Sequence, residues 1–248
     1  MIPYAKRKQS GGGEAVRPET QKIARFGLLT ALALVLGLMD RAIPLSAVLG
    51  GAAPGIKLGL ANTVLLYAVY LMDVGSCVLL MLVKVVLSGF LFGSLTAILY
   101  SLAGGALSLA VMLLIRRKPE RGAAGAVLLA LAAEGWLLYK HPHPKGQILW
   151  IMILTALAIV AGITVFILIR RGRIRGVTGT SLAGAVSHNI GQILVAGLVM
   201  HSPQLLYTYL PVLVGIGAAV GCLTGAVTER VFKALRIQPE VKQKEEGA

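Results

Sequence analysis

Charged residues are scarce in this sequence, and acidic ones are the scarcest. Only 14% of the 248 residues are charged, with 10 Asp and Glu against 24 Lys and Arg, whereas 56% are hydrophobic. A soluble domain of this length needs far more polar surface, so the composition excludes that class and predicts a polytopic membrane protein. The positive charge does not indicate nucleic-acid binding, because the basic residues form short clusters between long apolar runs.

The chain also lacks the motifs that common enzyme sites require. It has no G-x-x-x-x-G-K-[ST] loop for ATP hydrolysis, no D-D-x-x-D motif for a Mg²⁺-bound diphosphate, and no serine elbow or acid–base carboxylate pair. Its two cysteines, Cys77 and Cys222, lie inside apolar runs, which argues against a disulfide framework or a zinc motif. We therefore expect no catalytic residue, no metal and no cofactor, and a protein that is not an enzyme.

The sequence instead contains many apolar runs long enough to cross about 30 Å of hydrocarbon. A transmembrane domain is expected over residues 22–236, between a disordered basic tail at residues 1–21 and a polar tail at residues 237–248. Eight helices are predicted, at residues 22–43, 56–72, 75–93, 95–115, 122–139, 148–169, 178–200 and 208–228.

The basic residues give these helices an orientation. If both termini are cytoplasmic, 19 of the 24 Lys and Arg fall in cytoplasmic segments. Four fall on the outer side, namely Arg41, Lys57, Lys140 and Lys145, and Lys84 lies in the middle of a run. This asymmetry agrees with the positive-inside rule. The sequence thus predicts an all-α bundle of about eight transmembrane helices in the cell membrane, with both termini cytoplasmic.

Lys84 is the residue whose burial in the membrane costs the most free energy in this arrangement. It lies about 12 Å from either membrane surface at 1.5 Å per residue, and a lysine at the centre of a lone helix costs about 3 kcal/mol or more. Its ammonium group should therefore face the bundle interior or a wet cavity, and Ser88, one turn further on, makes that face mildly polar. Lys84 either binds a ligand or ion, or forms a structural pair.

Two further polar groups accompany it. His188 and Gln192 lie four residues apart on one helix face, and Asn189 is adjacent to His188. These side chains form either a ligand site or ordinary interhelical hydrogen bonds. In P-G-I-K-L-G-L-A-N, at residues 54–62, Pro54 and Gly55 break the chain before the second helix. Lys57 and the deeper Asn62 at this helix start would bind an anion. Alternatively, Lys57 only extends to the lipid headgroups.

Small residues recur at four-residue spacing in the first and last runs. Such faces let helix backbones approach closely in lipid, either within the bundle or against another membrane subunit. The residues concerned are Gly27 and Ala31, Ala33 and Gly37, and then Gly217, Gly221 and Gly225.

Four stretches carry a resemblance to a known bacterial membrane family. They cover most of residues 22–118 and 176–236, and the combination of P-G-I-K-L-G-L-A-N with H-N-x-G-Q is specific. The chain resembles the Gx transporter family, also called heptaprenyl diphosphate synthase component I, in these segments: PGIKLGLANTVLLYAVYL, LVKVVLSGFLFGSLTAILYSLAGGALSLAVM, SLAGAVSHNIGQILVAGLV and YLPVLVGIGAAVGCLTG.

That family is similar to the S components of energy-coupling factor (ECF) transporters. The resemblance implies a six-helix core that captures a micronutrient from outside the bacterial cytoplasmic membrane and relies on a coupling subunit and two ATPases for energy. It accounts for the missing P-loop, and it implies that Gly27, Ala31, Ala33 and Gly37 contact the coupling subunit. The chain is expected to depart from the family over residues 119–175, where an inserted transmembrane hairpin leaves the orientation of the core unchanged.

The leading interpretation is a non-catalytic membrane protein that binds and takes up a small, anionic solute. Two lysines against few buried acids favour the anion. The alternative is a non-catalytic subunit of a heptaprenyl diphosphate synthase that recruits the catalytic chain or binds the growing lipid tail. The predicted substrate-binding residues are Lys57, Asn62, Lys84, Ser88, His188, Asn189 and Gln192.

Overall fold

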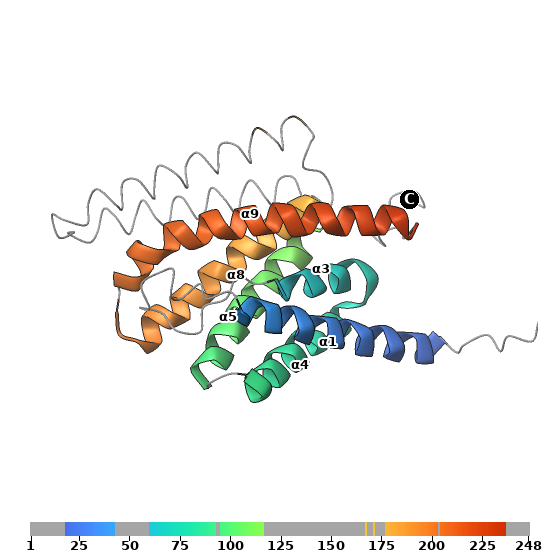
Figure 1. Cartoon of the computed structure of the whole chain (residues 1–248), viewed down its shortest axis with the longest axis horizontal. Helices are drawn as coiled ribbons and strands as arrows, with labels where there is room; N and C mark the ends of the chain where they lie inside the picture. Colours follow the sequence, from blue (N-terminus) through green and yellow to red (C-terminus); the bar gives the residue numbers. More distant parts are fainter. Residues whose placement is uncertain are drawn as a thin grey trace, which may run out of the picture.

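The computed structural model describes residues 18–42, 60–92, 95–116, 167, 171, 177–202 and 204–236. All regular secondary structure in these parts is helical, which confirms the all-α prediction for them (Figure 1). The helices are α1 (Pro18–Ala42), α3 (Asn62–Leu71), α4 (Val74–Phe92), α5 (Leu95–Ile115), α8 (Val177–Val199) and α9 (Gln204–Ala234).

Most predicted boundaries agree with the helices within four residues. α3 begins at Asn62, and residues 56–59 of the predicted span lie outside the described residues. α9 continues past the expected end at residue 228, because Phe232 is buried and Glu229 pairs with Lys233 one turn on, at 3.1 Å. Of the predicted hairpin helices at residues 122–139 and 148–169, the structure describes only Ile167, so the count of eight helices stays a prediction.

The outward faces of the helices are apolar. Phe90 is 82% exposed, Leu114 81% and Leu95 76%, and such side chains gain nothing from water. Five of the described helices, all except the ten-residue α3, are long and apolar enough to cross a membrane. The described bundle is that of a multi-pass membrane protein.

α8 lies at the centre of the bundle, with α5 on one side and α9 on the other (Figure 1). Seventeen of its 23 residues are buried, and most of these are glycine, alanine, serine or threonine. Helices with such small side chains approach closely, which is how van der Waals packing holds helices together in lipid.

The glycine stripe of α9 packs against α8. A Cβ atom added at Gly221 would lie 2.7 Å from the Cα atom of Leu182, and one added at Gly225 would lie 2.7 Å from the Cα atom of Thr178. On the other side of α8, a Cβ atom at Gly191 would lie 2.8 Å from the carbonyl oxygen of Ala103 in α5. Of the two interpretations of this stripe, packing within the bundle is therefore confirmed.

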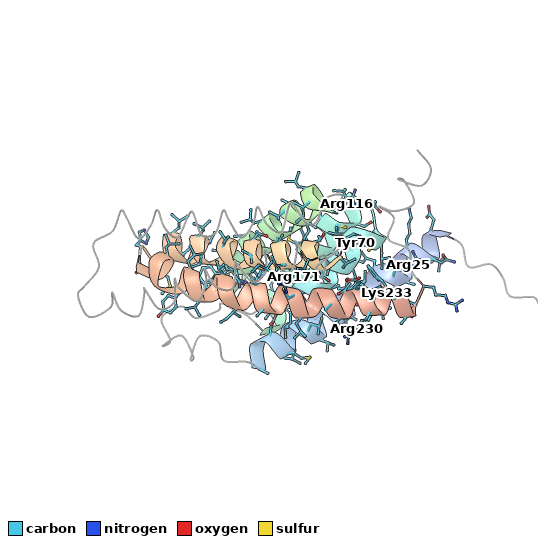
Figure 2. All side chains as sticks on the ribbon, turned by 90° about the horizontal axis from the view of Figure 1, so that it is seen from above. Arg25, Tyr70, Arg116, Arg171, Arg230 and Lys233 are labelled. Carbon is cyan, nitrogen blue, oxygen red and sulfur yellow. The ribbon has the colours of Figure 1, made fainter. Side chains whose placement is uncertain are left out.

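Four of the described basic side chains lie at one end of the bundle. Figure 2 shows Arg25, Arg116, Arg230 and Lys233 in its right half, where α1 begins and α9 ends. Contacts between the helix ends there include the donation from Nη1 of Arg116 to the Val69 carbonyl oxygen (3.3 Å) and from Thr178 to Oε2 of Glu229 (3.1 Å).

The same end includes the turn between α3 and α4. Asp73 caps the start of α4, accepting from the backbone N–H (3.0 Å) and the hydroxyl (2.8 Å) of Ser76. These hydrogen bonds, with a smaller contribution from the nearby Lys22 ammonium group, hold the pKa of the exposed Asp73 carboxyl below its usual value.

The close approach of α9 to α8 can be tested with two glycines of the same helix. Gly221→Ala places a methyl group against the α8 backbone, and we expect it to lower the free energy of unfolding by about 1–3 kcal/mol. In Gly215→Ala the added Cβ atom meets nothing within 4 Å, so this control should be neutral or slightly stabilising. Thermal unfolding in detergent measures both, and equal effects would contradict the packing described.

Candidate functional site

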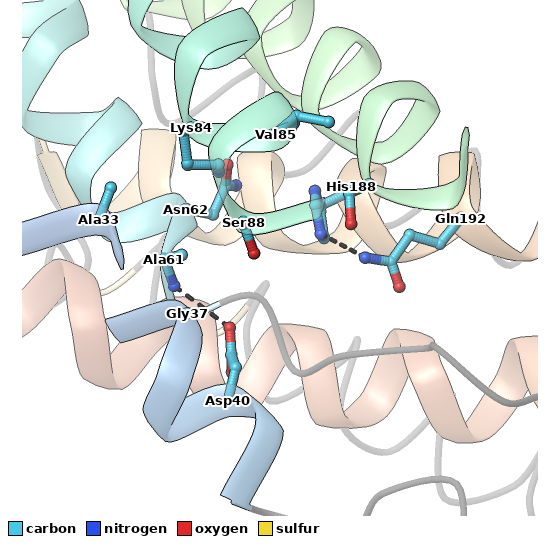
Figure 3. A pocket seen from close by; sticks show the side chains of 11 residues that line it. Ala33, Gly37, Asp40, Ala61, Asn62, Lys84, Val85, Ser88, His188 and Gln192 are labelled. Atoms are coloured by element: carbon cyan, nitrogen blue, oxygen red, sulfur yellow. Dashed lines mark hydrogen bonds between the residues drawn. The ribbon is translucent and has the colours of Figure 1, made fainter. Parts of the chain in front are cut away.

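Polar side chains from five helices converge on one cavity (Figure 3). Its volume is about 30 Å³, which is room for about two water molecules. Small or apolar residues complete the lining, among them Ala33 and Gly37 of α1. The polar residues that line it are Asp40 of α1, Asn62 of α3, Lys84 and Ser88 of α4, Ser101 of α5, and His188 and Gln192 of α8.

Lys84 faces the bundle interior, as its cost in hydrocarbon predicts. Its side chain is 7% exposed and lines the cavity, whereas Val86 and Leu87 on the same helix are 44% and 38% exposed on the outer surface. The polar face of α4 therefore points inward and the apolar face outward. Ser88, one turn from Lys84, lies on the same lining.

Asn62 ties three helices together beside the cavity. The Ser108 hydroxyl donates its one proton to the Gly184 carbonyl oxygen at 2.7 Å, so it must accept from the Asn62 amide nitrogen at 2.5 Å. The same nitrogen also reaches the Gly184 carbonyl, at 3.5 Å. This series of hydrogen bonds links α3, α5 and α8. It also fixes the orientation of the Asn62 side-chain amide, with the nitrogen Nδ2 toward Ser108 and the oxygen Oδ1 on the other side.

His188 and Gln192 form a second pair on the cavity wall. Their side-chain nitrogens, both Nε2, lie 2.6 Å apart one helical turn from each other, and Figure 3 shows the bond between them. Gly104 of α5 makes room for the pair, since a Cβ atom there would lie 2.9 Å from Nδ1 of His188 and 2.8 Å from Cγ of Gln192. With the Gln192 amide nitrogen as donor, Nε2 of His188 is the acceptor and the neutral imidazole carries its proton on Nδ1.

Asp40 of α1 belongs to the cavity, although it was not among the predicted site residues. Its side chain is 3% exposed, and Oδ2 accepts from the backbone N–H of Ala61 at 3.3 Å, just before α3 begins. A signal for this was present: Ala33, Gly37 and Asp40 follow one another at spacings of four and three, which places all three on one helix face. Ser101, from α5, was also not expected.

The structure brings together five of the seven predicted site residues: Asn62, Lys84, Ser88, His188 and Gln192. Lys57 lies outside the described residues.

Asn189 does not share the cavity. It is 1% exposed and faces α9, donating from Nδ2 to the Leu213 carbonyl oxygen at 2.6 Å. The expectation that it joins His188 in one site is wrong for a geometric reason, because consecutive helical residues point about 100° apart.

The small residues of α1 are divided between two surfaces. Ala33 and Gly37 are buried and line the cavity, so they pack inside the bundle, where another subunit does not reach them. Gly27 and Ala31 are exposed on the outer side of the helix. A contact between a partner subunit and α1 therefore stays a prediction for Gly27 and Ala31 alone.

Metal binding finds no support in the part of the chain that is described. No group of three or more His, Cys, Asp or Glu side chains is placed there to hold an ion. The cavity offers one carboxylate, one imidazole and an ammonium group, and the ammonium group repels a cation.

The helical fold and the polar cavity within it define a multi-pass membrane protein with an interior polar site. The chain belongs to the heptaprenyl diphosphate synthase component I family, whose model matches residues 29–134 and 143–231. This confirms the family named from the four sequence stretches. No curated protein and no solved structure matches the chain. The family match extends into residues 119–175 from both sides and leaves only residues 135–142 between its two parts, so it does not set that whole segment apart from the family.

The chain of hydrogen bonds through Asn62 can be tested by a double-mutant cycle. Ser108→Ala and Asn62→Ala each remove one partner, and we expect each to destabilise the protein by about 1–3 kcal/mol, since buried polar groups lose their bonds. The double variant should be less destabilised than the sum of both by about 1 kcal/mol. Thermal unfolding measures the cycle, and strict additivity would contradict the contact.

Proposed function

We propose that this chain is a non-catalytic protein of the bacterial cytoplasmic membrane that binds a small solute in the cavity, with Lys84 meeting the anionic group of the solute. The observation that carries the proposal is a buried lysine that shares one cavity with Asn62, His188 and Gln192. The solute would be taken up from the outer side, with energy supplied by partner subunits.

Burying polar side chains in a membrane costs free energy. An ammonium group, an imidazole and amides are expensive in hydrocarbon, and they persist within membranes mainly where they have a function. Pairing each one across helices would lower that cost without a cavity, as Asn189 does with the Leu213 carbonyl oxygen. The side chains of Lys84, His188 and Gln192 also lie on the wall of one cavity that has room for water. An anionic group placed there offsets the burial of the ammonium group.

The orientation follows from the distribution of charge. The end with Arg25, Arg116, Arg230 and Lys233 is cytoplasmic by the positive-inside rule. The cavity lies in the other half, where α1 ends and α3 begins, and so faces the outer side. Because the cavity holds only about two waters, a larger solute requires the helices to move apart, which fits transport driven by movement of the bundle against a partner.

The test is binding to the purified full chain. Mass spectrometry identifies a small molecule that co-purifies, and acetate and inorganic phosphate serve as anion probes in equilibrium binding. Lys84→Met and His188→Ala should each weaken binding about tenfold or more, the size of one hydrogen bond to a charged group. Lys233→Met, on the exposed cytoplasmic end, is the matched control and should bind as the wild type does. Unchanged binding in both cavity variants would remove this site.

A second candidate function is favoured by the family name. As a component of a heptaprenyl diphosphate synthase, the chain would recruit a catalytic subunit to the membrane or hold the growing prenyl tail. Its sequence has no D-D-x-x-D motif, so another chain would bind the diphosphates and perform the chemistry. The exposed apolar faces of α4 and α5 are compatible with a prenyl tail as well as with lipid.

Affinity purification from native membranes separates the two functions. A prenyl synthase chain in the complex, with prenyl elongation activity that falls when this chain is deleted, supports the synthase component. A membrane coupling subunit with two ATPases supports uptake, and their absence together with a stoichiometric synthase would refute it.

A further inference from the structure

We propose that the cavity selects an amphoteric solute: a small molecule of zero net charge that carries both an anionic group and an N–H or O–H donor, such as an amino-acid zwitterion. The inference rests on the proposed function, because it names the class of solute for that same site. Two independent features carry it, the carboxylate of Asp40 and the amide oxygen of Asn62.

Asp40 changes the charge balance of the cavity. Among the described residues that line it, Lys84 supplies one positive charge and Asp40 one negative charge, from two different helices and both at most 7% exposed. The sequence alone had favoured a plain anion, because it set two lysines against few buried acids. In a medium of low dielectric constant, a ligand with net charge leaves one charge in excess against these two side chains, whereas a ligand with both charges leaves none.

The position of Asp40 is fixed by the start of α3. The backbone N–H of Ala61 donates to Oδ2, and the start of a helix favours a negative charge. Figure 3 shows Asp40 on one side of the cavity and Lys84 on the other, with Ser88 between them in the view. The Asp40 carboxylate and the Lys84 ammonium group, held on separate helices, are complementary to the ammonium group and the carboxylate of a zwitterion, respectively.

Asn62 requires a donor. The residue is 7% exposed and lines the cavity, yet its Oδ1 atom has no hydrogen-bond partner among the described residues. The amide cannot be reversed to relieve this, because Ser108 needs a donor at Nδ2. A buried acceptor without a partner costs about 1–3 kcal/mol, and a solute that carries an ammonium, amide or hydroxyl group removes that cost.

Simpler ligands satisfy only part of this arrangement. A plain anion is attracted by Lys84 but repelled by Asp40, and it brings no donor to Asn62. A plain cation is repelled by Lys84. A net-neutral molecule with both groups interacts favourably with Lys84 and Asp40 and brings a donor to Asn62.

The experiment compares three small radiolabelled probes that differ only in charge pattern: glycine, acetate and methylammonium. Equilibrium binding to the purified full chain is measured at constant ionic strength. In the wild type, glycine should bind at least about tenfold more tightly than either other probe, the size of one charge-assisted hydrogen bond. The isosteric Asp40→Asn variant should lose this preference and bind acetate more tightly than the wild type does. Asp73→Asn, in the exposed turn before α4, is the matched control and should keep the preference for glycine.

The outcomes separate the inference from the proposed function. Acetate binding that depends on Lys84 but equals or exceeds glycine binding in the wild type overturns the amphoteric solute and leaves the anion site intact. A glycine preference that survives in Asp40→Asn also overturns it. If no probe binds, or if methylammonium binds best, both proposals fail. Should Asp40→Asn not fold, the order of the three probes in the wild type still decides.

Discussion

The burial of Lys84 in the middle of a membrane helix is the constraint on which the site depends. Hydrocarbon offers an ammonium group no partner, so the bundle must turn that face of α4 inward and surround it with polar groups. The structure does this with side chains from four other helices, and it keeps the apolar face of α4 toward lipid. The position of one charge thus determines the rotation of a helix and the place of the cavity.

The small residues determine how near the other helices come. α8 contributes His188 and Gln192 to the cavity because glycines on both of its neighbours allow close contact, Gly104 on α5 and the stripe at Gly217, Gly221 and Gly225 on α9. The same packing turns Asn189 away, toward a backbone carbonyl of α9. One polar stretch of sequence therefore serves two purposes, a cavity wall on one side of the helix and a structural bond on the other.

Much of this could be predicted from the sequence. Apolar length gave the described helices, and the cost of a buried lysine gave the inward face of α4. The sequence could not show which neighbour the Asn189 side chain faces, because that depends on where the surrounding helices lie. Asp40 was missed for the opposite reason: near the expected end of a helix a charge is ordinarily solvated, and only the start of α3 beside it shows that it is buried. The role of Ala33 and Gly37 likewise depended on which neighbours α1 has.

The most direct measurement of the central claim is the water accessibility of position 84. In a background with Cys77 and Cys222 replaced, Lys84→Cys and Val86→Cys are treated from the outer side with a small, charged, thiol-specific reagent. A thiol reacts as the thiolate, which forms in water and not in lipid. We predict labelling at position 84, which lines the cavity and is reached when the helices move apart as they do for a solute, and none at position 86, which is 44% exposed on the outward face of the same helix. Labelling at position 86 with none at position 84 would contradict the account.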